Sequence, residues 1–209
     1  MADRRHGAPP PPTDTTVRAA DWYGDDLSGQ VHTRVAFVDV DMTETTNRGA
    51  AFTECTFAGV RFNASTHSDA AFVNCTFTRC AFFDATFTNC KVVGSMFDGC
   101  GHDLMKVVGG DWSFVGLPGA DLRRASFDTV RMREADLVGV RAEGSTLRRV
   151  DLSGAWFHQA DLRRCDLRGS DLSTLDPLVV QLQGAVIDAN QACAIAANLG
   201  LVVRPDDET

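Results

Sequence analysis

Cysteine and histidine are the side chains of this sequence that could bind a metal or carry redox chemistry, and the chain has seven and five of them. All but one of the cysteines have numbers that are multiples of five, and they are Cys55, Cys75, Cys80, Cys90, Cys100 and Cys165. No spacing among them is the CxxC that zinc sites and redox-active dithiols use. We therefore interpret these cysteines as small apolar residues of a repeat.

The histidines and the acidic residues give no catalytic arrangement either. His32, His67 and His102 are also separated by multiples of five, and a turning repeat places them on different faces several turns apart. The sequence contains no Ser/His/Asp spacing, no GxGxxG before a helix and no phosphate loop of the GxxxxGK[ST] type. We therefore predict no catalytic residues, no metal ligands and no cofactor, and we expect a protein that is not an enzyme.

The period of five runs from Trp22 to Leu172 without a change of register. One position of each block is apolar with few exceptions, and it holds most of the 13 phenylalanines. Two places earlier lies a series of small residues, such as Ala50 and Ala70, to which the repeat cysteines belong. Neither an amphipathic helix nor an alternating strand produces this spacing.

A chain that turns by a fixed angle at every block buries both series. If four blocks make one square turn, successive turns stack like parallel strands about 4.8 Å apart. We predict such an all-β solenoid over residues 20–175. Its predicted core includes Phe52, Phe57, Phe72, Phe77, Phe87, Phe97, Leu122, Leu152, Leu162 and Leu167. The pattern weakens over residues 102–118, where Met105 and Gly110 occupy small positions, so we expect a kink or a widened coil there.

Several segments resemble the pentapeptide-repeat family: ADLRR at 120–124 and 160–164, CDLRG at 165–169, SDLST at 170–174 and CTFTR at 75–79. The resemblance implies a right-handed quadrilateral β-helix. Residues 70–77, 85–100 and 170–201 are most similar to the MfpA-type fluoroquinolone-resistance proteins, which are related to the Qnr proteins. That likeness implies a homodimer that binds DNA gyrase as a DNA mimic.

The two ends of the chain differ from the repeats. Residues 1–19, with four consecutive prolines, predict a disordered arm, and residues 204–209 predict a disordered tail. Residues 176–203 predict a last partial coil and a helix that starts with a capping box of Asp188 and Gln191, stops at Gly200, and covers the end of the solenoid. In the resembling proteins this segment makes the dimer contact, so we expect a homodimer joined through Leu178, Val180, Ile187, Ile195 and Leu199.

The charge of the chain bears on its partners. A formal net charge of −8 disfavours nucleic acid and anionic membranes as partners. Residues 22–172 hold 20 acids and 16 bases, far fewer net charges than duplex DNA of the same length. In a coil of four blocks the most acidic side carries the expected gyrase-binding carboxylates, which are Asp41, Glu44, Asp84, Asp103, Asp121, Glu143 and Asp161.

The function that the resemblance implies is a DNA-mimicking protein that binds DNA gyrase and modulates or protects it from inhibitors such as fluoroquinolones. Two alternatives stay open: an interaction rod without a topoisomerase partner, because a fold alone implies no function, and a self-resistance factor against a gyrase-targeting natural product. The sequence has no signal peptide and no apolar run of about 18 residues, so we expect a cytoplasmic protein.

Overall fold

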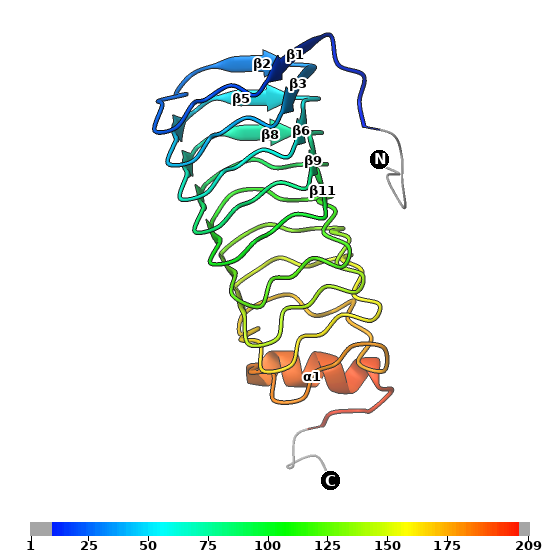
Figure 1. Ribbon diagram of the computed structural model, residues 1–209. Coiled ribbons are helices and arrows are strands. Elements are labelled where there is room, and N and C mark those ends of the chain that lie inside the picture. Colours follow the sequence, from blue (N-terminus) through cyan, green and yellow to red (C-terminus); the bar gives the residue numbers. More distant parts are fainter. Residues whose placement is uncertain (1–9, 205–209) are drawn as a thin grey trace.

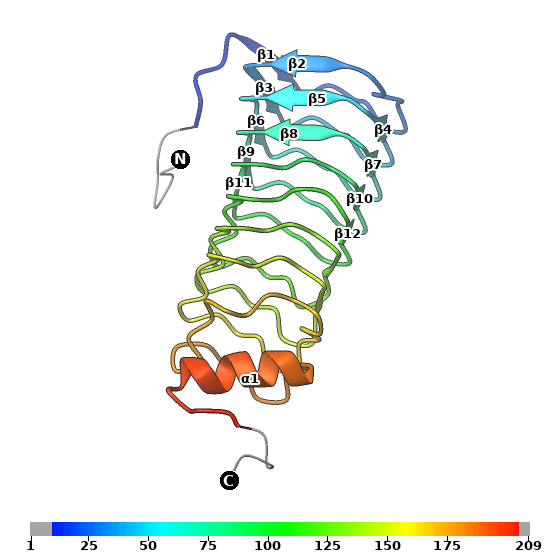
Figure 2. The same ribbon diagram turned by 180° about the vertical axis from the view of Figure 1, so that it is seen from behind.

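The computed structural model describes residues 10–204, which form a rod of stacked coils with one helix at its C-terminal end (Figure 1). The rod is a parallel β-solenoid of about 7 turns, so the predicted all-β solenoid is confirmed. Seen from behind, the coils keep the same stacking order, and the helix lies across the last of them (Figure 2). One coil spans four blocks of five, because Thr15 pairs with Val35 and Thr56 pairs with Thr76.

Three of the four sides carry β-sheets of very short strands. Face 1 is the five-stranded sheet β1 (Thr15–Arg18), β3 (Val35–Val38), β6 (Thr56–Ala58), β9 (Thr76–Thr78) and β11 (Met96–Asp98). Face 3 is the six-stranded sheet β4 (Thr46–Arg48), β7 (Thr66–Ser68), β10 (Thr86–Thr88), β12 (Lys106–Val108), β13 (Ser126–Asp128) and β14 (Thr146–Arg148). Face 4 is the three-stranded sheet β2 (Val31–Thr33), β5 (Ala51–Thr53) and β8 (Ala71–Val73).

The fourth side, face 2, carries single parallel bridges in place of named strands. Its column joins Asp21, Asp41, Arg61, Ala81 and Gly101, and a second column joins Asp121, Arg141, Asp161 and Gln181. Between the blocks the chain turns through a residue with positive φ, at positions whose numbers end in 4 or 9, such as Gly59 (67°) and Asn74 (53°). This turn, repeated in most blocks, makes the coil four-sided.

The interior holds the large and small series that the sequence separates. All ten predicted core side chains are at most 3% exposed. The phenylalanines form continuous stacks along the rod: Phe57 lies 4.7 Å from Phe77, and Phe77 lies 4.6 Å from Phe97, between ring centroids. A ring therefore meets an equivalent ring on the coil above and on the coil below, which requires coils of equal length and a constant register.

The expected irregularity over residues 102–118 appears as an interrupted ladder on face 2. On the coils before and after the interruption the ladder is regular. The backbone N–H of Phe82 donates to the carbonyl of Gly101 at 2.8 Å, and that of Leu122 donates to the carbonyl of Arg141 at 2.7 Å. Within residues 10–204, neither a bridge nor a backbone hydrogen bond joins His102 to Asp121. At the corner between faces 3 and 4, Gly110 has a φ of 89°, and a Cβ there would overlap the carbonyl oxygen of Cys90, so only glycine fits this small position.

Helix α1 (Ala189–Asn198) closes the C-terminal end of the rod. The predicted capping box is present: the side chain of Asp188 accepts from the N–H of Gln191, and Gln191 accepts in return from the N–H of Asp188. The helix stops before Gly200. The N–H of Gly200 donates to the carbonyl of Ala197, and the N–H of Leu201 donates to the carbonyl of Ala196. These two hydrogen bonds form a Schellman motif. Both ends therefore follow the sequence signals.

The same helix occupies backbone groups that the last coil leaves unpaired. The side-chain amide of Gln191 donates to the carbonyls of Leu167 (2.6 Å) and Ser170 (2.7 Å). The amide of Asn198 donates to Leu175 at 2.8 Å, and Asp188 accepts from the N–H of Gly169 at 2.9 Å. These contacts cover the open edge of the solenoid, which is otherwise a template for aggregation.

The predicted arm is wrong for part of its length. Residues 15–18 form β1, which pairs in register with β3, and the N–H of Asp14 donates to Arg34 at 2.7 Å. The solenoid therefore begins before residue 20, because Val17 continues the large series and packs against the core cluster. The rest of the predicted arm over residues 1–9, and residues 205–209 of the predicted tail, lie outside the described residues.

Candidate functional site

The cysteines and the interior histidines are packing residues in this structure. The described residues contain no group of three His, Cys, Asp or Glu side chains placed to hold a metal ion. Burial raises the pKa values of the Cys90 and Cys165 thiols to about 11, which keeps both thiols protonated at neutral pH. His67 stacks on Phe87 at 4.6 Å and hydrogen-bonds to Ser65 and Asn47, as a polar member of the core.

The seven carboxylates predicted to bind gyrase all lie on face 2. The two bridge columns place Asp41 above Arg61, and Asp121 above Arg141 and Asp161. The remaining four occupy later positions of the same blocks. The regular coil therefore brings together, on one side of the rod, residues as far apart in the chain as Asp41 and Asp161.

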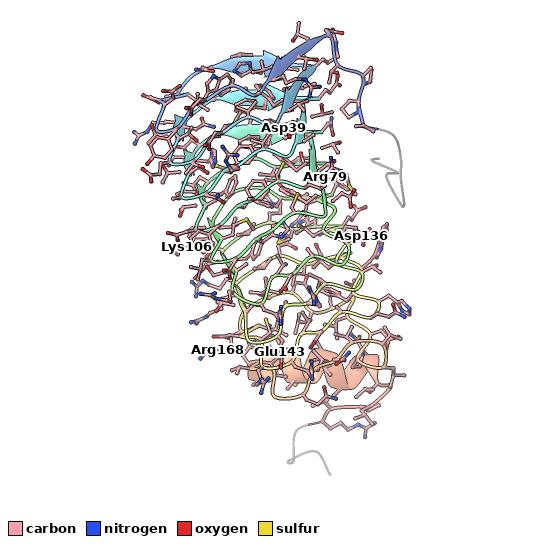
Figure 3. All side chains as sticks on the ribbon, in the orientation of Figure 1. Asp39, Arg79, Lys106, Asp136, Glu143 and Arg168 are labelled. Atoms are coloured by element: carbon pink, nitrogen blue, oxygen red, sulfur yellow. The ribbon has the colours of Figure 1, made fainter. Side chains whose placement is uncertain are left out.

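Arginine and lysine neutralise most of this carboxylate set. Six of the seven carboxylates form ion pairs, and Glu44 forms none among the described residues. The pairs are Asp41 with Arg61 (2.7 Å), Asp84 with Lys106 (2.9 Å), Asp103 with Arg124 (3.1 Å), Asp121 with Arg123 (2.6 Å) and Arg141 (3.1 Å), Asp161 with Arg163 (2.7 Å), and Glu143 with Arg164. Figure 3 shows Glu143 near the C-terminal end of the rod. In the same view, Lys106 and Asp136 lie on opposite edges of the rod.

The ion pairs also fix the protonation state of these groups. The hydrogen bond from Arg61 holds the pKa of Asp41 at about 2, and the hydrogen bond from Arg123 holds that of Asp121 at about 2. Arg163 likewise lowers the pKa of Asp161. These carboxylates are fully ionised at neutral pH, but each presents a salt bridge to solvent rather than a free negative charge.

On face 2 and at its corner with face 3, the carboxylates without an ion pair among the described residues lie on the N-terminal coils. Asp21, Asp25 and Glu44 form no ion pair among the described residues, and we call these three the free acidic patch. Glu44 accepts a hydrogen bond from the Tyr23 hydroxyl, which raises the pKa of Tyr23. The sequence already indicates this asymmetry, because residues 22–101 hold nine acids against five bases and residues 102–172 hold eleven of each.

A recess marks the interrupted ladder on face 2. It is lined by Gly101, His102, Asp103, Asp121, Arg123 and Arg124 and has a volume of about 490 Å³. His102 is 2% exposed, and neither ring nitrogen has a hydrogen-bond partner in the described part of the chain. Burial lowers the pKa of His102 to about 4, so the ring is neutral at physiological pH.

The residues predicted to join two copies are not equally available. Leu178 and Leu199 are 79% and 46% exposed, whereas Ile187 and Ile195 pack against the core cluster. Val180 is 8% exposed because its side chain continues the small interior series of its own coil, so it offers little surface to a second copy. The exposed apolar surface at this end extends instead over Val186, Leu201, Val202 and Val203.

The fold and this surface define a repeat solenoid whose exposed side chains are available for contacts with other molecules. Residues 145–174 match the family model described as pentapeptide repeats (8 copies). The chain therefore carries a pentapeptide-repeat family domain. Residues 20–102 match a second family model, described as the SV2A/B/C luminal domain. A search of curated proteins finds no match to the sequence.

Solved structures of two other proteins have similar folds. HetL, a pentapeptide repeat protein involved in heterocyst differentiation regulation from the cyanobacterium Nostoc, is 19% identical, with 84% of each chain covered and a TM-score of 0.53. A trypsin-treated variant of QnrB1, a plasmid-mediated fluoroquinolone resistance protein, is 22% identical, with 92% of this chain and 97% of that chain covered and a TM-score of 0.50. At such identities the likeness shows the fold alone. In residues 10–204 no helix has the length and apolar character needed to cross a bilayer.

Proposed function

We propose that this protein is a non-enzymatic, cytoplasmic rod that binds DNA gyrase in place of DNA and modulates its response to inhibitors such as fluoroquinolones. The observation that carries the proposal is the free acidic patch, whose carboxylates have no basic partner among the described residues. These carboxylates can pair with the basic side chains that bind DNA phosphates on gyrase. QnrB1, which is named as a fluoroquinolone resistance protein, has a similar fold and also supports the proposed link to fluoroquinolones.

The ion pairs of face 2 decide where such a contact would be made. A salt bridge already satisfies each carboxylate of the Asp84, Asp103 and Asp121 group, so a basic partner gains little there. The carboxylates of Asp21, Asp25 and Glu44 have no basic partner among the described residues. We therefore place the contact mainly on the N-terminal coils, with the paired carboxylates in a supporting role.

A supercoiling assay with purified gyrase, with and without ciprofloxacin, tests the proposal across a titration of this protein. Two triple variants to lysine are compared: one at Asp21, Asp25 and Glu44, and one at Asp84, Asp103 and Asp121. We expect the first variant to weaken gyrase binding at least tenfold and the second to weaken it less. Absence of any effect of the unaltered protein at micromolar concentration would refute the proposal.

A second function is an interaction rod with a partner other than a topoisomerase. The neutralised C-terminal half of face 2 favours it, because a zwitterionic surface does not imitate a polyanion. HetL, whose name assigns it to the regulation of cell differentiation, has a similar fold. Inactivity toward gyrase, together with capture of a different protein from cell extract, would support this function. A gyrase inhibitor made by a neighbouring gene cluster would instead indicate self-resistance.

We also propose that two copies join at the C-terminal end. Leu178, Leu199 and Leu201 are 79%, 46% and 61% exposed on or beside α1, and an apolar surface of this kind is typical of an interface. Light scattering at micromolar concentration should give twice the monomer mass, and Leu178→Asp with Leu199→Asp should restore the monomer. A monomer in the unaltered protein would contradict this arrangement.

A further inference from the structure

A groove of about 420 Å³ opens on the C-terminal part of face 1. The groove forms because the hydrogen-bond register between coils shifts there. The N–H of Gly139 donates to the carbonyl of His158. The equivalent N–H one coil later, that of Gln159, donates to the carbonyl of Val179 instead of that of Leu178. The shift is local, since Asp161 still pairs with Gln181, and it falls beside Pro177, which carries no N–H for the ladder. The last coil therefore bulges away from the one above, and the side chains between them stay accessible.

An indole stands in the middle of this groove. Trp156 pairs directly with Asp136 on the coil above, and Asp176 takes the equivalent position on the coil below. All three occupy the outward-facing position of their blocks, where the equivalent residues Thr56 and Thr76 are small. Trp156 is 38% exposed, whereas Trp112 is fully buried in the core. The interior does not require an aromatic ring at position 156, because the ring lies outside it.

The two flanking carboxylates are held in place but are not neutralised. One oxygen of Asp136 accepts from the N–H of Val138 at 3.1 Å, and one oxygen of Asp176 accepts from the N–H of Leu178 at 2.9 Å. Within the part of the chain that the structure describes, neither carboxylate has an ion pair, in contrast to Asp121 and Asp161. Figure 3 shows Asp136 on the same edge of the rod as Asp39 and Arg79, away from Glu143 and Arg168.

We propose that this groove binds the arginine side chain of a basic segment of a partner protein. A guanidinium is planar, stacks on aromatic faces and donates in a fork to carboxylates, so it matches an indole between two acids. The carboxylates are two coils apart, about 10 Å by the spacing of parallel strands, which leaves room for a guanidinium between them. Val138 and Val179 line the groove beside the indole and contact the aliphatic stem.

The charge of the groove selects the class of ligand. Two unpaired carboxylates repel phosphate, so nucleic acid and anionic lipid do not fit. Lysine offers a point charge that cannot stack as a plane, so it binds more weakly than arginine. The site lies on face 1, whereas the proposed gyrase contact lies on the N-terminal coils of face 2. The proposal therefore goes beyond the proposed function and does not depend on it.

Binding of a defined peptide to the full chain tests the proposal. The probe is acetyl-Gly-Arg-Arg-Gly-amide, with acetyl-Gly-Lys-Lys-Gly-amide for comparison, and the readout is the NMR indole signal of Trp156, assigned with Trp156→Leu. We expect a saturable shift with the arginine peptide and at least threefold weaker binding of the lysine peptide. Asp136→Asn and Asp176→Asn keep the backbone hydrogen bonds and should each weaken binding at least fivefold, as should Trp156→Leu, followed through peptide signals.

A matched control separates the groove from general attraction of a cationic peptide to an acidic protein. Asp171 is also unpaired among the described residues and accepts from Ser173 at 2.9 Å, but it lies on face 4. Asp171→Asn should change the affinity less than twofold. Three results would overturn the proposal. Asp171→Asn could lose as much peptide affinity as the groove variants, or the indole signal of Trp156 could show no saturable shift. The shift could also report the dissociation of two copies of the chain.

Discussion

Phe82 and His102 stack with their ring centroids 5.9 Å apart, further than the 4.9 Å between Phe62 and Phe82 on the coils above. The wider spacing coincides with the interruption of the face 2 ladder. His102 carries two buried nitrogens without partners among the described residues, and the same is true of the indole N–H of Trp112 nearby in the core. The rod therefore has a local weak point near its middle, produced by polar side chains in apolar positions.

This weak point predicts uneven amide protection. The amides of Phe82 and Asp84 donate to the next coil at 2.8 and 2.9 Å, whereas those of His102 and Leu104 have no such bond in residues 10–204. Hydrogen exchange should be at least tenfold faster at His102 and Leu104, because their opening does not require the ladder to break. His102→Phe removes the unpartnered imidazole and should stabilise the protein by about 1–3 kcal/mol. Equal protection on both coils would contradict the interruption.

Buried histidine predicts a loss of stability in mild acid. Burial lowers the pKa of His67 in the folded chain to about 3, against about 6.5 when unfolded. The unfolded chain therefore binds more protons between these pH values, and stability falls as the pH drops below about 6.5. His67 alone should lower the free energy of unfolding, measured with denaturant, by about 2–3 kcal/mol between pH 7 and pH 4.5.

The variant His67→Phe should flatten this pH profile, because a ring that does not titrate replaces the imidazole. Part of the dependence should remain, since burial also lowers the pKa of His102, to about 4. A steep profile in His67→Phe that matched the unaltered protein would show that another group titrates.

The phenylalanine stack predicts a large core effect. Phe77 is 2% exposed and lies between Phe57 and Phe97, so Phe77→Ala leaves a cavity bordered by two rings. We expect a destabilisation of about 3–5 kcal/mol in denaturant unfolding. Phe83 is 49% exposed on the neighbouring block, and Phe83→Ala should cost less than about 1 kcal/mol. Similar losses in the two variants would contradict the assignment of inward and outward positions.

The capping helix predicts a further stability effect. Gln191 is 6% exposed and joins the helix start to the carbonyls of Leu167 and Ser170. Gln191→Ala leaves these groups without partners and should destabilise the protein by about 2–3 kcal/mol. Exposure of the coil edge should also increase aggregation, measured by light scattering on heating. Asn190→Ala on the exposed side of the same helix is the control and should behave like the unaltered protein.

Much of this architecture was predictable because a repeat is a local property of the sequence. The period of five, the separation of Phe77 and Cys75 into large and small series, and the capping box of Asp188 with Gln191 are each visible in a short window. The constant register then propagates one coil along the whole rod. The early start at Thr15 was missed, because the proline run suggested a disordered arm and the pairing of β1 with β3 is not local.

The sequence by itself determined the coil, its core and its capping helix, because each depends on contacts that recur at fixed spacing. Only the tertiary structure decided which surface charges remain free. Asp121 meets Arg141 one coil away, while Asp136 and Asp176 flank an indole, and these partners depend on side-chain direction and on a local change of register near Pro177. Such contacts form between coils, so composition and period leave them open.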